Sequence, residues 1–283
     1  MVCPAGHCMS SFFIPRHRAA VAAFIRRPSR ALTALLAGSL LLTAAALRAD
    51  DLDSGIAAAA AQSYVFQHYL KDETITVMAQ NGVATLTGVV AEANHLALAQ
   101  DTVAGLPGVK SVVNLLKVDG VPPMEHSDRW LRLNVKAVLE FDRSLGISAT
   151  AVLIEGGVVT LRGEAASEAQ KELTTAYVND IRGVVELRNN MTVAASAANS
   201  TTSPNVIMDD ASITALVKAV LRAHQSTCEI STAVQTAEGV ATVSGVAQNL
   251  AEQNQVTRLV SGTKGVIKVN NTVTIKAPLG NHD

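Results

Sequence analysis

The feature that most constrains this chain is a set of glycines that recurs three times with unchanged spacing. In each copy the second glycine follows the first by six residues, and the third follows the second by twenty. An asparagine comes six residues after the third glycine in every copy: Asn114, Asn189 and Asn271. A spacing kept this closely, in segments of otherwise different sequence, predicts one small domain repeated three times. The nine glycines are Gly82, Gly88 and Gly108, then Gly157, Gly163 and Gly183, then Gly239, Gly245 and Gly265.

The stretch between the first and second glycine of each copy predicts a β-strand. It reads Gly-Val-Ala-Thr-Leu-Thr-Gly in the first copy, and β-branched residues dominate the same positions in the other two. Alternate positions are apolar, which is the period of a strand with one buried face. The positions expected on the buried face are Ala84 and Leu86, Val159 and Leu161, and Ala241 and Val243.

A tight turn precedes this strand in each copy. The turn pairs are Asn81-Gly82, Gly156-Gly157 and Glu238-Gly239. Asn-Gly and Gly-Gly accept the positive φ angles that a two-residue hairpin turn requires. Each copy is therefore expected to open its sheet with a β-hairpin. The first hairpin strands are expected within residues 75–79, 147–154 and 228–236.

One helix is expected after each hairpin. It spans about 12 to 15 residues, a typical length for a globular protein. Ser167 and Asn249 are good N-cap residues for the second and third copies, whereas Glu92 is a poor one for the first. The repeated asparagines are expected to cap a loop or bond to the backbone. The apolar position that packs on the sheet is occupied by Val103, Val178 and Val260.

A further helix is expected in front of each hairpin. In the third copy apolar residues recur with the helical period, and Lys218 and Arg222 lie on the opposite side. In the second copy the helix starts near Asp128, an acceptable N-cap. A last strand with one face exposed to water follows the third glycine. The predicted fold is α+β: three tandem modules, each helix-strand-strand-helix-strand, with a three-stranded sheet covered by two helices.

Two linkers are expected between the modules. The first contains Pro122-Pro123 and is short and stiff, whereas the second is rich in Ala, Ser, Thr and Asn and is expected to be flexible. The third module is therefore expected to move semi-independently. The predicted division is a signal peptide at 1–49, modules at 50–118, 128–193 and 210–276, linkers at 119–127 and 194–209, and a tail at 277–283.

The repeated unit resembles the BON domain of osmotically inducible periplasmic proteins and related envelope proteins. The resemblance rests on the Gly-Val-x-Thr-Leu-x-Gly strand, the twenty-residue step to a second Gly-Val, and the order of helices and strands. It covers nearly the whole chain after residue 49. It implies binding to phospholipid membranes or other envelope components, and it implies no catalytic motif.

The N-terminus independently indicates export. Five arginines between positions 16 and 30 precede an uncharged run from Ala31 to Leu47, and the acidic pair Asp50-Asp51 follows Ala49. This order is typical of a secretory signal peptide cleaved after Ala49. Alternatives are an uncleaved membrane anchor, a start at Met9, and twin-arginine export through the Arg26-Arg27 pair. No cysteine adjoins the cleavage point, so the expected product is periplasmic and not a lipoprotein.

The charge of the exported chain excludes some partners. The leader takes six basic residues with it, which leaves 17 basic residues against 24 acidic ones and a net charge of about −7. Nucleic acid is therefore not an expected partner, since phosphate binding relies on clustered Lys and Arg. Cys228 is the one cysteine left, and it is expected to be a small buried residue at the start of a strand, with a reactive thiol as the alternative. The seven histidines are scattered, so neither a metal nor another cofactor is expected.

Candidate membrane contacts must form a local patch, because the whole chain is acidic. An aromatic residue lies among cations at the start of the helix in the second copy: Arg129, Trp130, Arg132 and Lys136. Such a group suits lipid headgroups. The alternative is that Trp130 covers a domain edge and the arginines are solvated. Secondary candidates in the first copy are Tyr64, Phe66 and Tyr69, whereas His68 is expected on a helix surface.

The sequence thus predicts a non-enzymatic envelope protein that binds anionic phospholipid surfaces or envelope proteins, in osmotic or envelope stress as the resemblance implies. No nucleophile with a base, paired acids or phosphate-binding loop recurs among the copies. The alternative is a protein-interaction module or a holdase chaperone for exported outer-membrane proteins, which would use exposed strand edges or apolar faces.

Overall fold

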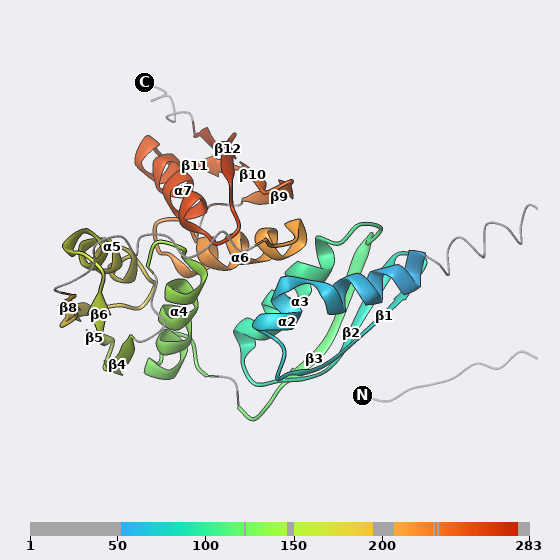
Figure 1. Ribbon diagram of the computed structural model, residues 1–283, viewed down its shortest axis with the longest axis horizontal. Coiled ribbons are helices and arrows are strands. Elements are labelled where there is room, and N and C mark those ends of the chain that lie inside the picture. Colours follow the sequence, from blue (N-terminus) through green and yellow to red (C-terminus); the bar gives the residue numbers. More distant parts are fainter. Residues whose placement is uncertain are drawn as a thin grey trace, which may run out of the picture. The chain divides into compact units, whose positions relative to one another are not determined.

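The computed structural model describes residues 52–121, 123–145, 150–194, 207–228, 230 and 232–276. The expected signal peptide, most of the second linker and the expected tail lie outside these residues. The described residues form three repeating α+β modules, which confirms the predicted fold class (Figure 1).

The main elements follow the predicted order in every module, and the second and third modules add two short strands each, which pair as a separate two-stranded sheet. The first module consists of a helix at 52–62, α2 (Tyr64–His68), β1 (Thr74–Gln80), β2 (Val83–Val90), α3 (Ala93–Ala104) and β3 (Ser111–Val118). The second consists of α4 (Asp128–Phe141), β4 (Ala151–Glu155), β5 (Val158–Arg162), β6 (Glu164–Ala165), α5 (Glu168–Asn179), β7 (Glu186–Asn189) and β8 (Thr192–Val193). The third consists of α6 (Asp210–Ala223), β9 (Ala233–Ala237), β10 (Val240–Ser244), β11 (Val246–Ala247), α7 (Leu250–Gly262), β12 (Lys268–Asn271) and β13 (Thr274–Ile275).

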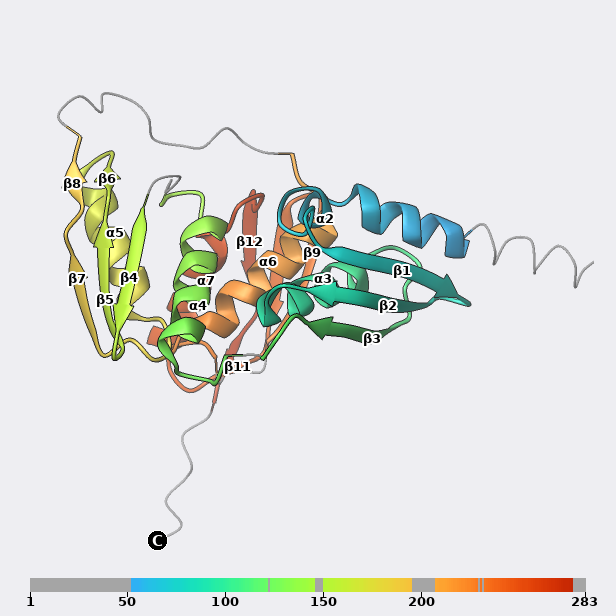
Figure 2. The same cartoon turned by 90° about the horizontal axis from the view of Figure 1, so that it is seen from below.

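Each module contains a mixed three-stranded sheet with the second hairpin strand at its centre. The hairpin is antiparallel, and the last strand returns parallel to the central one after the second helix. In the first module, for example, Leu86 pairs with Val77 on one side and Asn114 on the other. The views in Figures 1 and 2 show β1, β2 and β3 side by side, with the helices of that module on one face of the sheet. The other face of this sheet is not covered by a helix of its own module.

The hairpin turns have the predicted backbone conformation. Both turn residues have positive φ in every copy, including Glu238 at 52° and Gly239 at 74°. One aspartate per module holds the turn, because its carboxylate accepts from both turn amides. These bonds run from Asp53 to Asn81 and Gly82 (2.6 and 2.9 Å), from Asp128 to Gly156 and Gly157 (2.8 and 2.9 Å), and from Asp210 to Glu238 and Gly239 (2.8 and 2.9 Å).

The expectation that Asp128 caps α4 is therefore wrong by one residue. Ser127 is the N-cap, and its hydroxyl accepts from the amide of Trp130 at 3.3 Å. Asp128 is the first residue inside the helix, and its carboxylate turns to the hairpin instead. The backbone amides of Gly157 and Gly156 lower the pKa of Asp128, since they hydrogen-bond the charged form.

The second helices begin as the sequence indicates. Ser167 and Asn249 accept hydrogen bonds from backbone amides three residues later, whereas Glu92 makes no such bond. The repeated asparagines bond to the backbone as expected. Asn271, for instance, donates to the carbonyl oxygen of Gln253 at 2.9 Å and accepts from the amide of Val273 at 2.9 Å. These bonds join the last strand of a module to its second helix.

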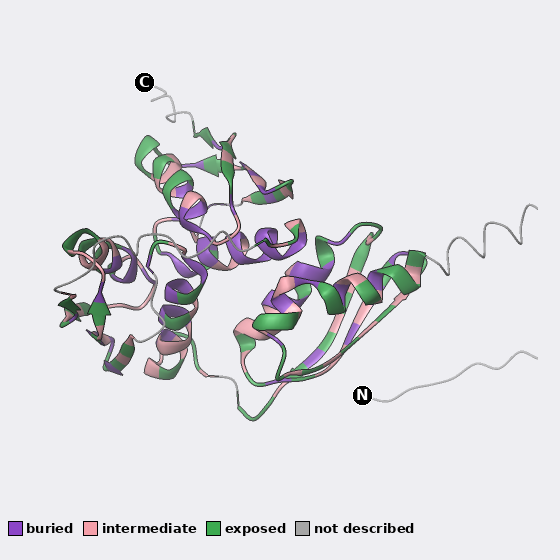
Figure 3. Cartoon of the chain, in the orientation of Figure 1, coloured by how far each residue is buried: buried purple, intermediate pink, exposed green. Residues whose placement is uncertain are grey.

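The predicted core positions are buried. All six strand positions and the three helix valines are shielded from solvent, and they belong to the hydrophobic core. Figure 3 shows this burial concentrated on the facing sides of helices and strands, with α6 buried along most of its length. Every residue from 211 to 217 is buried, and burial on all sides is typical of a helix that packs on more than its own sheet.

Two details differ from the sequence-based expectation. Cys228 lies in a turn after α6 rather than at the start of a strand, and it is half-buried, with its Sγ 3.4 Å from the carbonyl oxygen of Gln225. The strand begins later, at Ala233. The helix in front of the first hairpin is interrupted at Ser63, whose hydroxyl accepts from the amide of Phe66 and so starts α2 as a separate turn.

The second and third modules associate through equivalent residues. Asp142 pairs with Thr263 in an antiparallel bridge, and Ile181 pairs with His224 in another. Asp142 and His224 hold the same position in their modules, as do Ile181 and Thr263, so exchanging the two modules reproduces the contact. The main-chain hydrogen bonds between these modules also come in equivalent pairs. In one pair, the amide of Arg143 donates to the carbonyl oxygen of Gly262 (2.9 Å), and the amide of Gln225 donates to that of Asp180 (2.6 Å). In the other, the amide of Lys264 donates to the carbonyl oxygen of Phe141 (2.8 Å), and the amide of Arg182 donates to that of Ala223 (3.1 Å). This is the pattern of an isologous, locally twofold interface.

The first module lacks one of the donors that this pairing uses. The residue equivalent to the donors Arg182 and Lys264 is Pro107, which has no amide hydrogen. The first module instead contacts α6 of the third module. The amides of Tyr64 and Val65 donate to the side chains of Asp209 (2.8 Å) and Ser212 (3.0 Å).

Candidate functional site

The cations of the predicted lipid-contact group form a stripe on α4. Arg129, Arg132 and Lys136 fall within about 60° of one another at 100° per residue, since an α-helix has about 3.6 residues per turn. Arg129 and Lys136 are exposed and Arg132 is half-buried. None of the salt bridges between described residues involves these three side chains. Glu140, one turn after Lys136, ends the cationic part of this face.

Trp130 lies on a different side of α4 from this stripe. Its indole is half-buried, packs against the hydrophobic core and contacts the ring of His126 at 5.3 Å between centroids. The indole also packs beside Gly183, where a Cβ would lie 3.6 Å from Trp130 Cζ3, an ordinary van der Waals distance. The structure thus separates Trp130 from the three cations with which the sequence groups it.

Two of the three secondary candidates, Tyr64 and Tyr69, form part of an aromatic cluster rather than an exposed patch. Tyr64 contacts Tyr69 edge to face at 5.9 Å between ring centroids, and Tyr69 contacts Phe141 of the second module at 5.0 Å. Burial raises the pKa of the Tyr69 hydroxyl above the ordinary tyrosine range. Phe66 is half-buried against the core. His68 is exposed, as expected, and stacks on Tyr64 at 3.8 Å.

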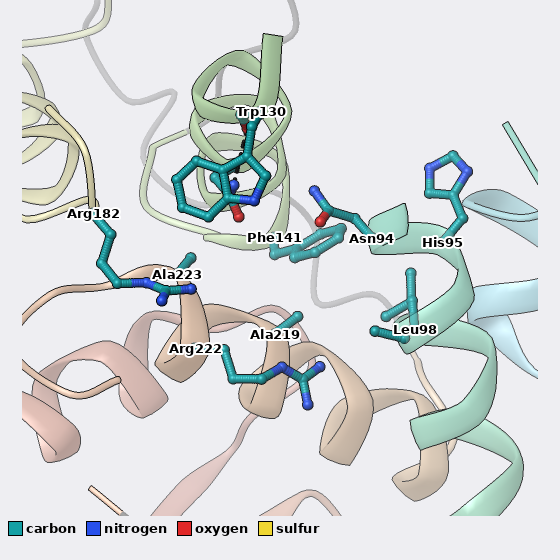
Figure 4. A pocket seen from close by; sticks show the side chains of 11 residues that line it. Asn94, His95, Leu98, Trp130, Phe141, Arg182, Ala219, Arg222 and Ala223 are labelled. Carbon is teal, nitrogen blue, oxygen red and sulfur yellow. Dashed lines mark hydrogen bonds between the residues drawn. The ribbon is translucent and has the colours of Figure 1, made fainter. Parts of the chain in front are cut away.

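A pocket of about 150 Å³ lies where the three modules meet. Figure 4 shows Trp130 reaching into it from α4 and Arg182 from the segment after α5, with α6 and α3 forming the other walls. Its apolar lining consists of two aromatic residues, a leucine and three alanines, and its polar lining of two arginines, two asparagines and a histidine. The lining residues are Asn94, His95, Ala97, Leu98, Trp130, Asn134, Phe141, Arg182, Ala219, Arg222 and Ala223.

The charges around this pocket are only partly compensated. The Arg182 guanidinium lies 5.4 Å from the centre of the Trp130 ring, and its Nη1 is 3.4 Å from a carboxylate oxygen of Glu125, which is largely exposed. Its Nε is buried and has no hydrogen-bond partner among the described residues. Arg222 pairs with Asp101 at 2.6 Å, and Lys218 approaches the same carboxylate at 3.5 Å. One carboxylate therefore serves two cations there.

The sequence did not identify Arg182 as a site residue. It also did not identify the pocket residues that the first and third modules supply. Lys218 and Arg222 were expected on the solvent side of their helix, and they instead meet Asp101 of another module. Arg182 precedes a repeated glycine, a position held by Pro107 and Lys264 in the other copies, so the sequence offers no repeated pattern there. The site depends on how modules pack against one another, which no local pattern reports.

An exposed apolar sheet face is the other unusual surface. On β1 and β3 the side chains of Met78, Val113 and Leu115 are 65, 43 and 56 % exposed. Met78 and Val113 flank Thr85 of β2 in one row across the sheet. The residues at these three positions are Leu153, Arg188 and Asn190 in the second module, and Gln235, Asn270 and Thr272 in the third. Only the first module leaves an apolar row here.

Fold and surfaces together define a class of repeated, small α+β binding modules. The family model for the BON domain matches residues 52–120, 127–195 and 209–277. The matches cover most of the chain, and the chain belongs to the BON domain family. This confirms the resemblance seen in the sequence, including its three tandem copies.

Solved structures resemble the chain at low sequence identity. No curated protein matches the chain. Among solved structures it is similar to CdsD, a structural protein of the type III secretion system of Chlamydia trachomatis, with 17 % identity over 75 % of this chain and 90 % of that chain, at a TM-score of 0.21. A structure of the C-terminal domain of CdsD matches with 18 % identity over 75 % of this chain and 96 % of that one, at the same TM-score. Scores this low do not establish a shared arrangement of the modules.

Family membership sets the coarse function. BON domains are periplasmic or envelope-associated modules for phospholipid binding or interaction, and the family is generally non-catalytic. Within the described residues, no helix is long and apolar enough to cross a bilayer.

Proposed function

We propose that this protein binds anionic phospholipid surfaces of the cell envelope through the cationic stripe of α4. The observation that supports it most is the set of three neighbouring cations, Arg129, Arg132 and Lys136, without a salt bridge to a described residue. Each basic residue near an anionic membrane surface contributes about 1 kcal/mol of attraction. Three of them together would contribute about 3 kcal/mol of local attraction, although the net charge of the chain without its leader is about −7.

Trp130 has a supporting role in this proposal. Its half-buried indole packs beside Gly183 and Arg182, so it fixes the side of α4 opposite the membrane contact. The membrane contact itself is electrostatic, and binding should weaken as salt screens the surface charges.

The experiment is co-sedimentation of residues 50–283 with vesicles of phosphatidylglycerol and phosphatidylcholine, and with vesicles of phosphatidylcholine alone. The test variant replaces Arg129, Arg132 and Lys136 with alanine. The control replaces three exposed cations elsewhere, Lys117, Arg162 and Lys268, so that both variants lose the same charge. The proposal predicts loss of binding in the test variant only, and equal loss in both would reduce the effect to net charge.

The exposed apolar row of the first module favours a second candidate function, the holding of unfolded exported proteins. Apolar side chains of an extended client would pack on Met78, Val113 and Leu115, which have no cover from their own module. The test is suppression of aggregation of an unfolded outer-membrane protein. Leu115→Asn and Val113→Arg, which install the residues of the second module, should abolish suppression, whereas the α4 variant should retain it.

A further inference from the structure

We propose that the pocket where the three modules meet binds a small organic anion, a phosphate or carboxylate group on a short apolar chain. The pocket is separate from the α4 stripe, and this site stands independently of the membrane-surface function. A cavity of about 150 Å³ is large enough to hold a group the size of a benzene ring. The ligand part that enters is therefore an anionic group with a few carbon atoms.

The polar lining is complementary to an anion. Arg182 and Arg222 both line the pocket, and no acidic side chain does. The Arg182 side chain is 30 % exposed, and its Nη1 makes only a long contact of 3.4 Å with a carboxylate oxygen of Glu125. A planar guanidinium binds phosphate or carboxylate oxygens through two parallel hydrogen bonds. A bound anion would therefore give this guanidinium a closer partner than Glu125.

Trp130, Phe141 and Leu98 supply the apolar part of the lining. The indole is held in place because Arg182 stacks over it at 5.4 Å and the ring of His126 meets its edge at 5.3 Å between centroids. These walls would exclude water from a short alkyl chain next to the guanidinium. Inorganic phosphate offers no such chain, and an alcohol offers no charge, so neither should fill the site alone.

The three-module lining gives binding a structural consequence. Arg182 belongs to the second module, Arg222 to α6 of the third, and Asn94 and Leu98 to α3 of the first. An anion between these side chains would link all three modules, since its oxygens bond to more than one of them. The bound protein should unfold at a higher temperature than the free protein.

The test uses residues 50–283 and butyl phosphate as the probe. Trp130 is the only tryptophan of the chain, so its fluorescence reports directly on the pocket. The expected result is a saturable change in emission, with affinity at least tenfold weaker for inorganic phosphate and for butanol. A change that does not saturate, or equal affinity for inorganic phosphate, would overturn the proposal.

Variants separate the pocket from other anion sites. Arg182→Gln should weaken butyl phosphate binding at least tenfold. Arg258→Gln is the matched control, because Arg258 also stacks on an aromatic ring, at 6.0 Å from Tyr177, outside the pocket. Ala219→Met fills the pocket without changing charge and should also abolish binding, which keeps the test decisive if Arg182→Gln perturbs the fold. Unchanged affinity in Ala219→Met would refute the site.

The α4 variant distinguishes this proposal from the membrane proposal. Replacing Arg129, Arg132 and Lys136 should leave butyl phosphate binding unchanged while vesicle binding is lost. Loss of butyl phosphate binding in that variant, with retention in Arg182→Gln, would place the anion on the stripe and contradict the pocket.

Discussion

Asp142 and His224 occupy the same position in the second and third modules, and both are buried at the interface between these modules. The two residues face different partners. His224 Nδ1 lies 3.2 Å from a carboxylate oxygen of Asp180. Asp142 faces Gly262, which holds the position of Asp180 in the third module. A Cβ at Gly262 would approach Asp142 Oδ2 far too closely, so the glycine makes room for the buried carboxylate. A symmetric backbone contact thus carries asymmetric side chains.

The buried carboxylate of Asp142 should make stability depend on pH. Burial raises its pKa above the ordinary value of 3.8, although the amides of Ser144 and Leu145 oppose this. A carboxyl group with a raised pKa binds more protons in the folded state than in the unfolded state. The free energy of unfolding is therefore highest in acid and decreases as the pH rises from about 3.8 through the folded pKa. Asp142→Asn should therefore raise the melting temperature at pH 7, with a smaller gain at pH 3. A lower melting temperature at pH 7 would mean that the fold requires the ionised carboxylate.

The aspartate that holds each hairpin turn should matter most in the third module, where Glu238 adopts positive φ without being Asn or Gly. Asp210→Ala should lower the free energy of unfolding by about 1–2 kcal/mol, a cost typical of a lost cap. Glu238→Gly should stabilise by about 0.5–1 kcal/mol, because glycine accepts this conformation without strain. Urea unfolding measures both. A destabilising Glu238→Gly would show that turn strain is not relevant here.

Gly88 and Gly55 give opposite predictions for the same substitution. A Cβ at Gly88 would lie 1.9 Å from the carbonyl oxygen of Thr74, at a φ of +131°, whereas a Cβ at Gly55 meets nothing within 4 Å. Gly88→Ala should destabilise by at least about 2 kcal/mol. Gly55→Ala lies inside the helix at 52–62 and should stabilise by about 0.5–1 kcal/mol. Thermal unfolding of the two variants checks this, and equal effects would contradict the close contact at Gly88.

The contacts of α6 bear on how the modules move. The sequence of the second linker predicts semi-independent motion of the third module, but α6 bonds to Tyr64 through Asp209 and to Asp101 through Arg222. These contacts, and the twofold interface, predict that all three modules tumble together. NMR relaxation should then give one rotational correlation time for residues of β1, β5 and β10. A shorter time for β10 would restore the expectation drawn from the linker.

The sequence predicted those features of the fold that a local residue pattern determines. The glycine spacing located the strands and turns, and the helical period located the buried side of α6, because both are encoded by neighbouring residues. The aspartate that bonds to each turn was missed, although it recurs 29 residues before the first glycine of every copy, as Asp210 before Gly239 shows. Trp130 was grouped with its cationic neighbours by adjacency, while helix geometry places it on another side. Arg182 was invisible because its role arises from contacts between modules.

The most direct test of the central claim is the fraction of protein that sediments with phosphatidylglycerol vesicles at low and high salt. The membrane proposal predicts binding at low salt that falls steeply as salt increases, is absent on phosphatidylcholine, and is lost when Arg129, Arg132 and Lys136 become alanine. The charge-matched variant at Lys117, Arg162 and Lys268 should sediment like the unmodified protein. Equal binding by the α4 variant and the unmodified protein would contradict the proposal that this stripe contacts the membrane.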